Sequence, residues 1–320
     1  MFSKIISAIK SCCGKLNGLF LNLSDRAKPR KSLRWAVSFT LWFLLILYIV
    51  FGIFIGIKVY TYKSDTKLEM VASKFYPLPA AVIGNRVVWV KDYYSHLQYI
   101  QQFSSKTKQP LPEAKELRTQ IVNQLIENKI LIYQAIKYGL SVTNKDVETA
   151  YAKIVEQSGG ETEVKKVLTD LYGMTEKQFK VLVKEQVVKE KIQNDLIAQV
   201  KVAHILIKDE ARANEVAQKA KNGEDFAELA KKYSEDAKSR DAGGELGWLS
   251  KGQLVIDGKS YPDFDEAVFK ANINEITGPV KTEIGHEIIK VSEKKGKLAV
   301  NFQSWLEGLK KESRIWRFVK

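Results

Sequence analysis

The chain has little cysteine: among its 320 residues the only two are Cys12 and Cys13, adjacent to each other near the N-terminus. Everything after them lacks the means to form a disulfide bond. Large domains in that part must therefore be stabilised by apolar cores, which a composition of 45% hydrophobic residues can supply. Two alternatives stay open for the pair itself, acylation beside a membrane or two unmodified thiols.

Histidine is also scarce, and the three present are His96, His204 and His286. They are widely separated and have no cysteine nearby, so they do not form the ligand spacing of a metal site. The glycines of DAGGELG at 241–247 match no phosphate-binding loop. The sequence therefore predicts neither a metal nor another cofactor.

Charged side chains are absent from Ala36–Ile57, which is almost entirely apolar. At about 1.5 Å per residue, a helix over this stretch crosses a hydrocarbon core of about 30 Å. A cleavable signal peptide is the alternative. It is disfavoured because a long leader precedes the stretch, and because IGIKVYTYKSD at 55–65 offers no small-residue cleavage site. The stretch is predicted to be an uncleaved transmembrane anchor.

The leader, residues 1–35, carries eight basic side chains against a single acid, Asp25. Because positively charged flanks stay on the cytoplasmic side, we expect a cytoplasmic N-terminus and extracytoplasmic main domains in a single-pass protein of the cell membrane. Half of the net charge of +14 lies in this leader, so the basic balance reflects membrane topology and does not indicate nucleic-acid binding. Apolar residues at helical spacing within 2–9 leave two alternatives, a helix on the inner leaflet or a disordered basic tail.

The region 66–199 has mainly helical patterns. Two short apolar stretches around the turn Gly84-Asn85 predict a hairpin, which leads into a helix from about Lys91. Two capping boxes predict the starts of later helices, at Thr143-x-x-Asp146 and Thr175-x-x-Gln178.

Between Pro112 and Gly139 the pattern predicts one long amphipathic helix, with proline near its start and glycine at its C-cap. Its expected apolar stripe consists of Leu117, Ile121, Leu125, Ile132 and Ile136. Such a helix must pack on partners, which the following helices supply.

The segment VAHILIK at 202–208 alternates as a strand that is buried on both faces, with His204 among apolar residues. GGELGW at 243–248 and GPVKTEIGHEIIKV at 278–291 follow it. Motifs in this order resemble the parvulin family of peptidyl-prolyl isomerases. The resemblance implies an α+β domain that isomerises prolyl bonds.

The resemblance also implies a polar network made by His204 in the first strand, Asp236 in YSED and Thr282 in the KTEIG turn. Relatives usually carry a second histidine where this chain has Glu287. Strand alternation turns the neighbouring His286 to the opposite face. A carboxylate beside Asp236 would raise one carboxyl pKa or demand a cationic His204.

The family's proline pocket maps onto Leu246, Leu254 and Phe264, each of which could also be plain core. The connection VIDGKSYPD between the last two is longer than usual and includes the turn pair Asp257-Gly258, which would allow a flap over the pocket. The stretch after the first strand lacks the clustered arginines and lysines that recognition of a phosphoprotein would need.

The helical patterns before VAHILIK, in LIENKILIYQAIKYGLSVTNKDVETAY at 125–151, resemble the N-terminal chaperone domain of the SurA, PrsA and PpiD foldases. In this group a C-terminal piece returns to the helical domain, so the parvulin domain is an insertion. The last segment has apolar residues at helical spacing and then an aromatic run, namely Phe302, Trp305, Leu306, Leu309, Ile315, Trp316 and Phe318. Its aromatics favour docking over an exposed tail.

The chain is therefore interpreted as an α+β protein of five parts. They are a basic leader at 1–35, a transmembrane helix at 36–57, a helical chaperone domain at 66–199, a parvulin domain at 200–294 and a returning segment at 295–320. The resemblance implies a membrane-anchored, extracytoplasmic isomerase and chaperone for unfolded or proline-containing exported polypeptides. The missing second histidine leaves open a catalytically inactive parvulin-fold chaperone that only binds unfolded clients.

Overall fold

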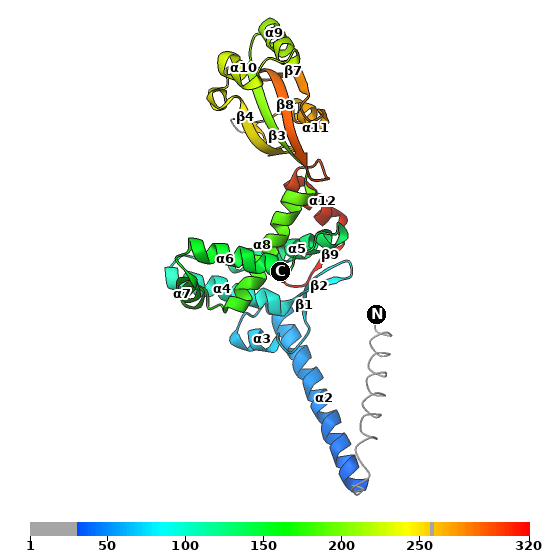
Figure 1. The fold of residues 1–320 in the computed structure, drawn as a ribbon. Helices are drawn as coiled ribbons and strands as arrows, with labels where there is room; N and C mark the ends of the chain where they lie inside the picture. Colours follow the sequence, from blue (N-terminus) through cyan, green and yellow to red (C-terminus); the bar gives the residue numbers. More distant parts are fainter. Residues whose placement is uncertain (1–30, 257–258) are drawn as a thin grey trace, which may run out of the picture. The chain divides into compact units, whose positions relative to one another are not determined.

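The computed structural model describes residues 31–256 and 259–320 (Figure 1). The chain divides into two compact units, Met1–Thr61 and Tyr62–Lys320. The expectations for Cys12, Cys13 and the amphipathic leader lie outside the described residues.

The first described element is one long helix, α2 (Lys31–Tyr60). Within it Val37–Tyr60 is long and apolar enough to cross a membrane, by length and composition. The helix extends past both ends of the predicted Ala36–Ile57 because lysine and arginine, which flank the apolar run, are good helix formers. α2 is thus a candidate membrane anchor.

From Tyr62 to Leu196 the chain is mainly helical. Its α-helices are α3 (Lys67–Ala72), α4 (Val90–Thr107), α5 (Ala114–Lys137), α6 (Asn144–Gln157), α7 (Glu161–Val167) and α8 (Glu176–Lys191). A π-helical turn extends each of the last two, η1 (Leu168–Tyr172) and η2 (Ile192–Leu196).

Both predicted capping boxes are confirmed. The Thr143 hydroxyl accepts from the Asp146 backbone N–H while the Asp146 carboxylate accepts from the Thr143 N–H at 2.7 Å. Thr175 and Gln178 make the same exchange at the start of α8. Each box gives otherwise unpaired helix N–H groups an acceptor, which is why α6 and α8 begin where they do.

The predicted apolar stripe of α5 is correct at its start and wrong at its end. Leu117, Ile121 and Leu125 are buried, but Ile136 is 70% exposed. Residues four apart drift by about 40° per step around a helix of 3.6 residues per turn. The buried face therefore moves to neighbouring residues, Ile126, Ile130, Leu131 and Ala135.

A three-stranded sheet joins the beginning and the end of the second unit, Tyr62–Lys320. The predicted hairpin is confirmed as β1 (Pro79–Ile83) and β2 (Arg86–Trp89), which pair antiparallel. The third strand is β9 (Ile315–Arg317), and it pairs antiparallel with β1, giving the order β2-β1-β9. The chain's last strand thus lies in the same sheet as its first two.

The closing segment docks on the rest of its unit, as expected, although not all of its aromatic side chains are buried. In α12 (Phe302–Glu312) the buried side chain is Leu306, and beyond β9 it is Val319. Trp316 is 66% exposed. Backbone pairing with β1 therefore secures the segment, because a strand can form its ladder hydrogen bonds while its aromatic side chain points to solvent.

The remaining residues form a four-stranded antiparallel sheet of order β4-β3-β8-β7. Its strands are β3 (Gln199–Ile207), β4 (Glu245–Ser250), β7 (Ile276–Thr282) and β8 (Gly285–Lys295). The helices that accompany it are α9 (Glu210–Lys221), α10 (Phe226–Tyr233), η3 (Arg240–Ala242) and α11 (Pro262–Lys270). A short hairpin, β5 (Val255–Ile256) and β6 (Lys259–Ser260), precedes α11, and its predicted turn Asp257-Gly258 lies outside the described residues.

Both faces of the central strands are buried, as predicted for VAHILIK. Ile205 and Ile288 belong to an apolar cluster with α9 and α10. Val202 and Ile289 belong to a second cluster with α11. Because neighbouring residues of a strand point to opposite faces, one strand pair supplies both clusters.

Glu185→Gln is expected to weaken the pH dependence of unfolding. Burial, then the negative charge of Asp92, raises the pKa of Glu185 to about 7. The folded state therefore keeps a proton that the unfolded chain releases near 4.5, so stability falls as pH rises from about 4.5 to 7. Glutamine retains an oxygen for Asn128 Nδ2, which lies 2.7 Å from the Glu185 carboxylate, and removes the buried charge.

Urea unfolding of a fragment beginning at Tyr62 checks this. We expect Glu185→Gln to be more stable than wild type at pH 8 by on the order of 1 kcal/mol, and equal to it at pH 4. Glu190→Gln, an exposed position on the same helix, serves as the control. Equal pH dependence in wild type and Glu185→Gln would contradict the prediction.

Candidate functional site

Strands β3 and β8 place a histidine and a glutamate on one face of the sheet. In their antiparallel register His204 is opposite Ile289, and Leu206 is opposite Glu287. His204 and Glu287 are therefore diagonal neighbours on the same face. His286, one residue earlier, points to the other face, as predicted.

A glycine turn holds the backbone of His204. The His204 N–H donates to the carbonyl oxygen of Gly244 at 2.8 Å. A Cβ on Gly244 would come within 2.1 Å of the His204 carbonyl oxygen, and its φ of +79° is in the left-handed region. Only glycine fits there, which explains the second glycine of GGELGW.

The His204 ring bridges two carboxylates. Its Nδ1 lies 2.8 Å from Oε2 of Glu287, and its Nε2 lies 3.0 Å from Oδ2 of Asp236. The hydroxyl of Ser239 lies 2.9 Å from the same Nε2 and donates to Asp236 Oδ2 at 2.6 Å. The structure thus brings together three of the four predicted network residues.

This arrangement favours a positively charged His204. Burial is the strongest influence on the His204 pKa and lowers it. The hydrogen bond and charge of Glu287, followed by those of Asp236, outweigh burial, so the His204 pKa is raised. Burial acts first on Asp236 too, and hydrogen bonds from Ser239 and His204 outweigh it, so the Asp236 pKa is lowered. Of the two outcomes that the sequence allowed, the cationic histidine is the one favoured.

Exposure distinguishes the members of the network. The side chains of His204 and Glu287 are each 1% exposed, whereas that of Asp236 is 21% exposed. Asp236 is therefore the one of these three side chains that solvent reaches, while His204 and Glu287 are buried. In the part of the chain that the structure describes, no group of three or more His, Cys, Asp or Glu side chains is arranged to hold a metal ion.

Sequence reasoning missed two serines in the loop that carries Asp236. Ser239 donates its backbone N–H to Asp236 Oδ2 at 3.2 Å. Ser234 accepts from the N–H groups of Leu206 and Asp236 at 3.2 and 3.3 Å, tying the loop to β3. The available signal was the Asp-x-x-Ser spacing, typical of a turn in which an aspartate caps the backbone three residues on.

Thr282 is not brought into the His204 network. Its hydroxyl donates to the Gly285 carbonyl at 2.9 Å and closes the turn between β7 and β8. The strand register explains this, since Thr282 pairs with Gly285 at the end of the ladder, beyond the level of Glu287. Any role of Thr282 at the site stays a prediction.

The three predicted pocket residues share one apolar cluster beside the network. Phe264 is 1% exposed, and its ring meets that of His204 edge to face at a centroid distance of 6.3 Å. Leu246 and Leu254 pack against the same cluster and are half-buried. The two leucines thus keep part of their surface exposed, whereas Phe264 is fully in the core.

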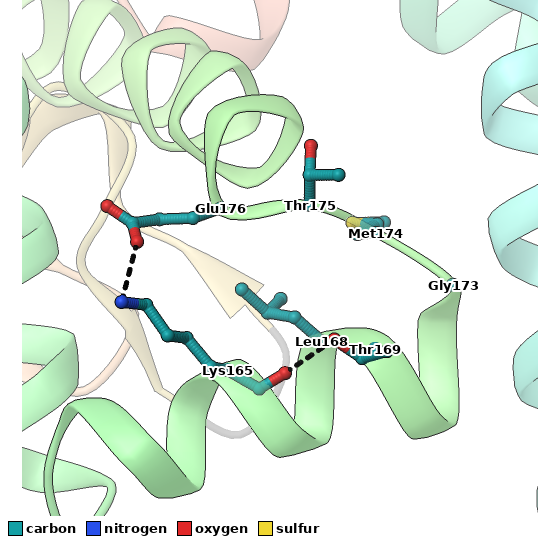
Figure 2. Close-up of a pocket in the computed structure, with 7 residues that line it drawn as sticks. All are labelled: Lys165, Leu168, Thr169, Gly173, Met174, Thr175 and Glu176. Carbon is teal, nitrogen blue, oxygen red and sulfur yellow. Dashed lines mark hydrogen bonds and ion pairs between the residues drawn. The ribbon is translucent and has the colours of Figure 1, made fainter.

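A separate hollow lies in the helical part, between η1 and the start of α8 (Figure 2). Its volume is about 360 Å³. Figure 2 shows Lys165 and Glu176 facing each other across it, where their charged groups lie 3.4 Å apart. The other lining residues are Leu168, Thr169, Gly173, Met174 and Thr175. None belongs to the sheet that carries His204, so the hollow is not part of that site.

Two family models match the chain: a SurA-like N-terminal domain at residues 30–225 and a PPIC-type PPIASE domain at residues 180–295. Foldase protein PrsA of Geobacillus sp. (strain WCH70) is 31% identical over 222 residues, which cover 63% of this chain and 76% of that protein. The chain belongs to the PrsA foldase family. This confirms the predicted family resemblance and the α+β class with its helical and parvulin domains.

Other PrsA proteins are similar over shorter stretches. Foldase protein PrsA 3 of Bacillus cereus is 36% identical over 194 residues, covering 57% of this chain and 65% of that protein. The crystal structure of the peptidylprolyl isomerase PrsA from Bacillus anthracis covers 60% of this chain and 86% of its own, at 27% identity and a TM-score of 0.30.

Glu287→Gln is expected to lower the pKa of His204, because the nearer of its two carboxylates loses its charge. In wild type the pKa of His204 is raised above its ordinary value of 6.5. The stabilisation from a charged His204 is therefore fully present below pH 6.5 and is lost as pH rises through the raised value. NMR of the ring carbons and nitrogens against pH measures this titration.

Glu293→Gln on the same strand is the control, since Glu293 is exposed and pairs with Lys201. It should leave the titration of His204 unchanged. If His204 titrates in Glu287→Gln as it does in wild type, Glu287 does not stabilise the positive charge of His204.

Proposed function

We propose that the chain isomerises prolyl peptide bonds at the His204 site, while its helical part binds unfolded exported polypeptides. One observation carries the proposal: a partly exposed Asp236 carboxylate is held ionised by hydrogen bonds from Ser239 and from a buried His204, which Glu287 contacts on its other side. Half-buried Leu246 and Leu254 pack in the apolar cluster that reaches His204 through Phe264. The names of the relatives, foldase and peptidylprolyl isomerase, support the same activity.

The chemistry needs no nucleophile and no cofactor. Turning a prolyl amide costs about 20 kcal/mol because the planar bond is stabilised by resonance, which places negative charge on the carbonyl oxygen. An ionised Asp236 near that oxygen repels this negative charge. The repulsion raises the free energy of the planar state relative to that of the twisted state. The leucines would hold the proline ring, and a charge oriented in advance by His204 needs no rearrangement during the turn.

Glu287 supports this activity instead of removing it. As an acceptor 2.8 Å from Nδ1, it stabilises the imidazolium whose other nitrogen faces Asp236. The second candidate, a parvulin-fold chaperone without turnover, is favoured by one observation. Phe264, one of the three residues predicted to hold the proline ring, is 1% exposed and so is not accessible to a ligand in this structure.

The domain boundaries proposed are a helical domain at 66–199 completed by 295–320, with the parvulin domain at 200–294 inserted between them. Two contacts support this division. β9 pairs with β1, and Gln199 is opposite Lys295 in the β3–β8 ladder, so the two ends of the inserted domain are adjacent. An insertion with adjacent ends leaves the host fold undisturbed.

His204→Ala is expected to slow isomerisation by about tenfold or more, corresponding to a loss of roughly 1.4 kcal/mol of transition-state stabilisation. Without the imidazolium, Asp236 loses its positively charged partner and keeps only the hydrogen bonds from Ser239 and Lys238. Exchange between cis and trans forms of a proline-containing peptide, measured by NMR with a fragment beginning at Tyr62, reports the rate.

His286→Ala is the matched control, because His286 is a histidine of the same sheet on the opposite face. It should retain wild-type exchange. If wild type binds the peptide but shows no exchange above background, the chaperone without turnover is the correct function. If His204→Ala is as active as wild type, the proposed site is wrong.

We further propose that the N-terminus is cytoplasmic and that Lys58–Lys320 is extracytoplasmic, on the basis of the basic leader before α2. Protease added to intact cells, or to spheroplasts where an outer membrane is present, should digest Lys58–Lys320 and spare a cytoplasmic marker. Protection of this part until the cells are lysed would contradict the orientation.

A further inference from the structure

Helix α3 has its apolar and polar faces inverted for a helix in water. Its apolar side chains Leu68 and Val71 are 49% and 54% exposed, and Phe75 just beyond it is 70% exposed. Glu69 and Ser73, which would ordinarily face solvent, are each 2% exposed. The spacing of three and four residues puts the exposed apolar side chains on one face.

The buried polar side chains are satisfied where they lie. The hydroxyl of Thr66 donates to the Glu69 carboxylate, and the hydroxyl of Ser73 donates to the Met70 carbonyl at 2.8 Å. Both hydrogen bonds are made within the segment 66–73, so the carboxylate and the hydroxyl are paired although they are buried.

The segment before α3 is also tied to the domain. Arg118 on α5 forms an ion pair with Asp65 at 2.7 Å and donates to the Lys63 carbonyl at 2.7 Å. Tyr94 on α4 donates to the Ser64 carbonyl at 2.7 Å. These contacts fix α3 and its outward apolar face relative to α4 and α5.

The chain connects this face closely to the candidate anchor. α2 ends at Tyr60 and α3 begins at Lys67, so residues 61–66 alone separate them. Even fully extended, such a connector spans only about 20 Å. Exposed Lys67 and Lys74 flank the apolar face, and their amines match the phosphate groups of lipids.

We propose that the outward face of α3, formed by Leu68, Val71 and Phe75, is inserted into the phospholipid headgroup region of the membrane in which α2 anchors the chain. A short apolar face bordered by lysines is the composition that binds at a membrane interface, where apolar side chains enter the lipid and amines stay at the phosphates. The contact holds the helical domain at the bilayer in one orientation. This inference rests on the proposed membrane anchor.

The test uses the full chain with Cys12→Ser and Cys13→Ser, reconstituted in phospholipid vesicles. Val71→Cys carries an environment-sensitive fluorophore, and Leu68→Cys is a second reporter. Val181→Cys is the matched control, because Val181 on α8 is also a valine with 56% exposure. Leu47→Cys, within α2, reports whether the anchor enters the bilayer.

We expect a lipid that carries its quencher near the headgroup to quench the probes at 71 and 68 severalfold more than the probe at 181. Aqueous iodide should quench them in the opposite order. A lipid that carries its quencher in the acyl chain tests the probe at 47, which is near the middle of the span. If that probe is quenched while those at 71 and 181 behave alike, the inference is wrong and the anchor is supported. If the probe at 47 is not quenched by this lipid, the anchor itself is wrong.

Two further results would overturn the inference, because each would show that something other than lipid covers the outward face of α3. Protection of the probe at 71 that appears only after an unfolded polypeptide is added would make the face a client-binding surface. Protection that disappears when the protein is diluted in lipid would make it a contact between two copies of the chain.

Discussion

The pairing of β3 with β8 is the constraint on which the rest of the second unit depends. Its register places His204 and Glu287 on one face and sends Ile205 and Ile288 to the other. The same ladder brings Gln199 opposite Lys295. One set of backbone hydrogen bonds therefore builds the site, separates the two apolar clusters and brings residues 199 and 295 side by side.

The site depends on the positive charge of His204 and the two carboxylates beside it. A histidine buried to 1% exposure would ordinarily be neutral, because burial disfavours its cation. Carboxylates on both sides of the ring reverse that preference, and one of them, Asp236, stays in contact with solvent. The glutamate that departs from the usual family pattern is thus an integral part of the network, and its effect is to strengthen the positive charge on His204.

Local sequence signals predicted most of the secondary structure. The capping boxes at Thr143 and Thr175 and the hairpin at Gly84 are correct because each depends on residues within a few positions of one another. The stripe through Ile136 failed because a spacing of four does not follow 3.6 residues per turn over a long helix. The closing segment docks as predicted, by pairing of β9 with β1, while Trp316 itself is 66% exposed.

For the site, the sequence by itself determined the strand that carries His204 and the opposite directions of His286 and Glu287, since strand alternation is a local property. Only the tertiary structure decided that Ser239 joins the network, that Thr282 turns to Gly285 instead, and that Asp236 is the member reaching solvent. The reason is distance along the chain. Hydrogen bonds between His204 and residues 32, 35 and 83 positions away are set by how a loop and two strands pack, which no local pattern specifies.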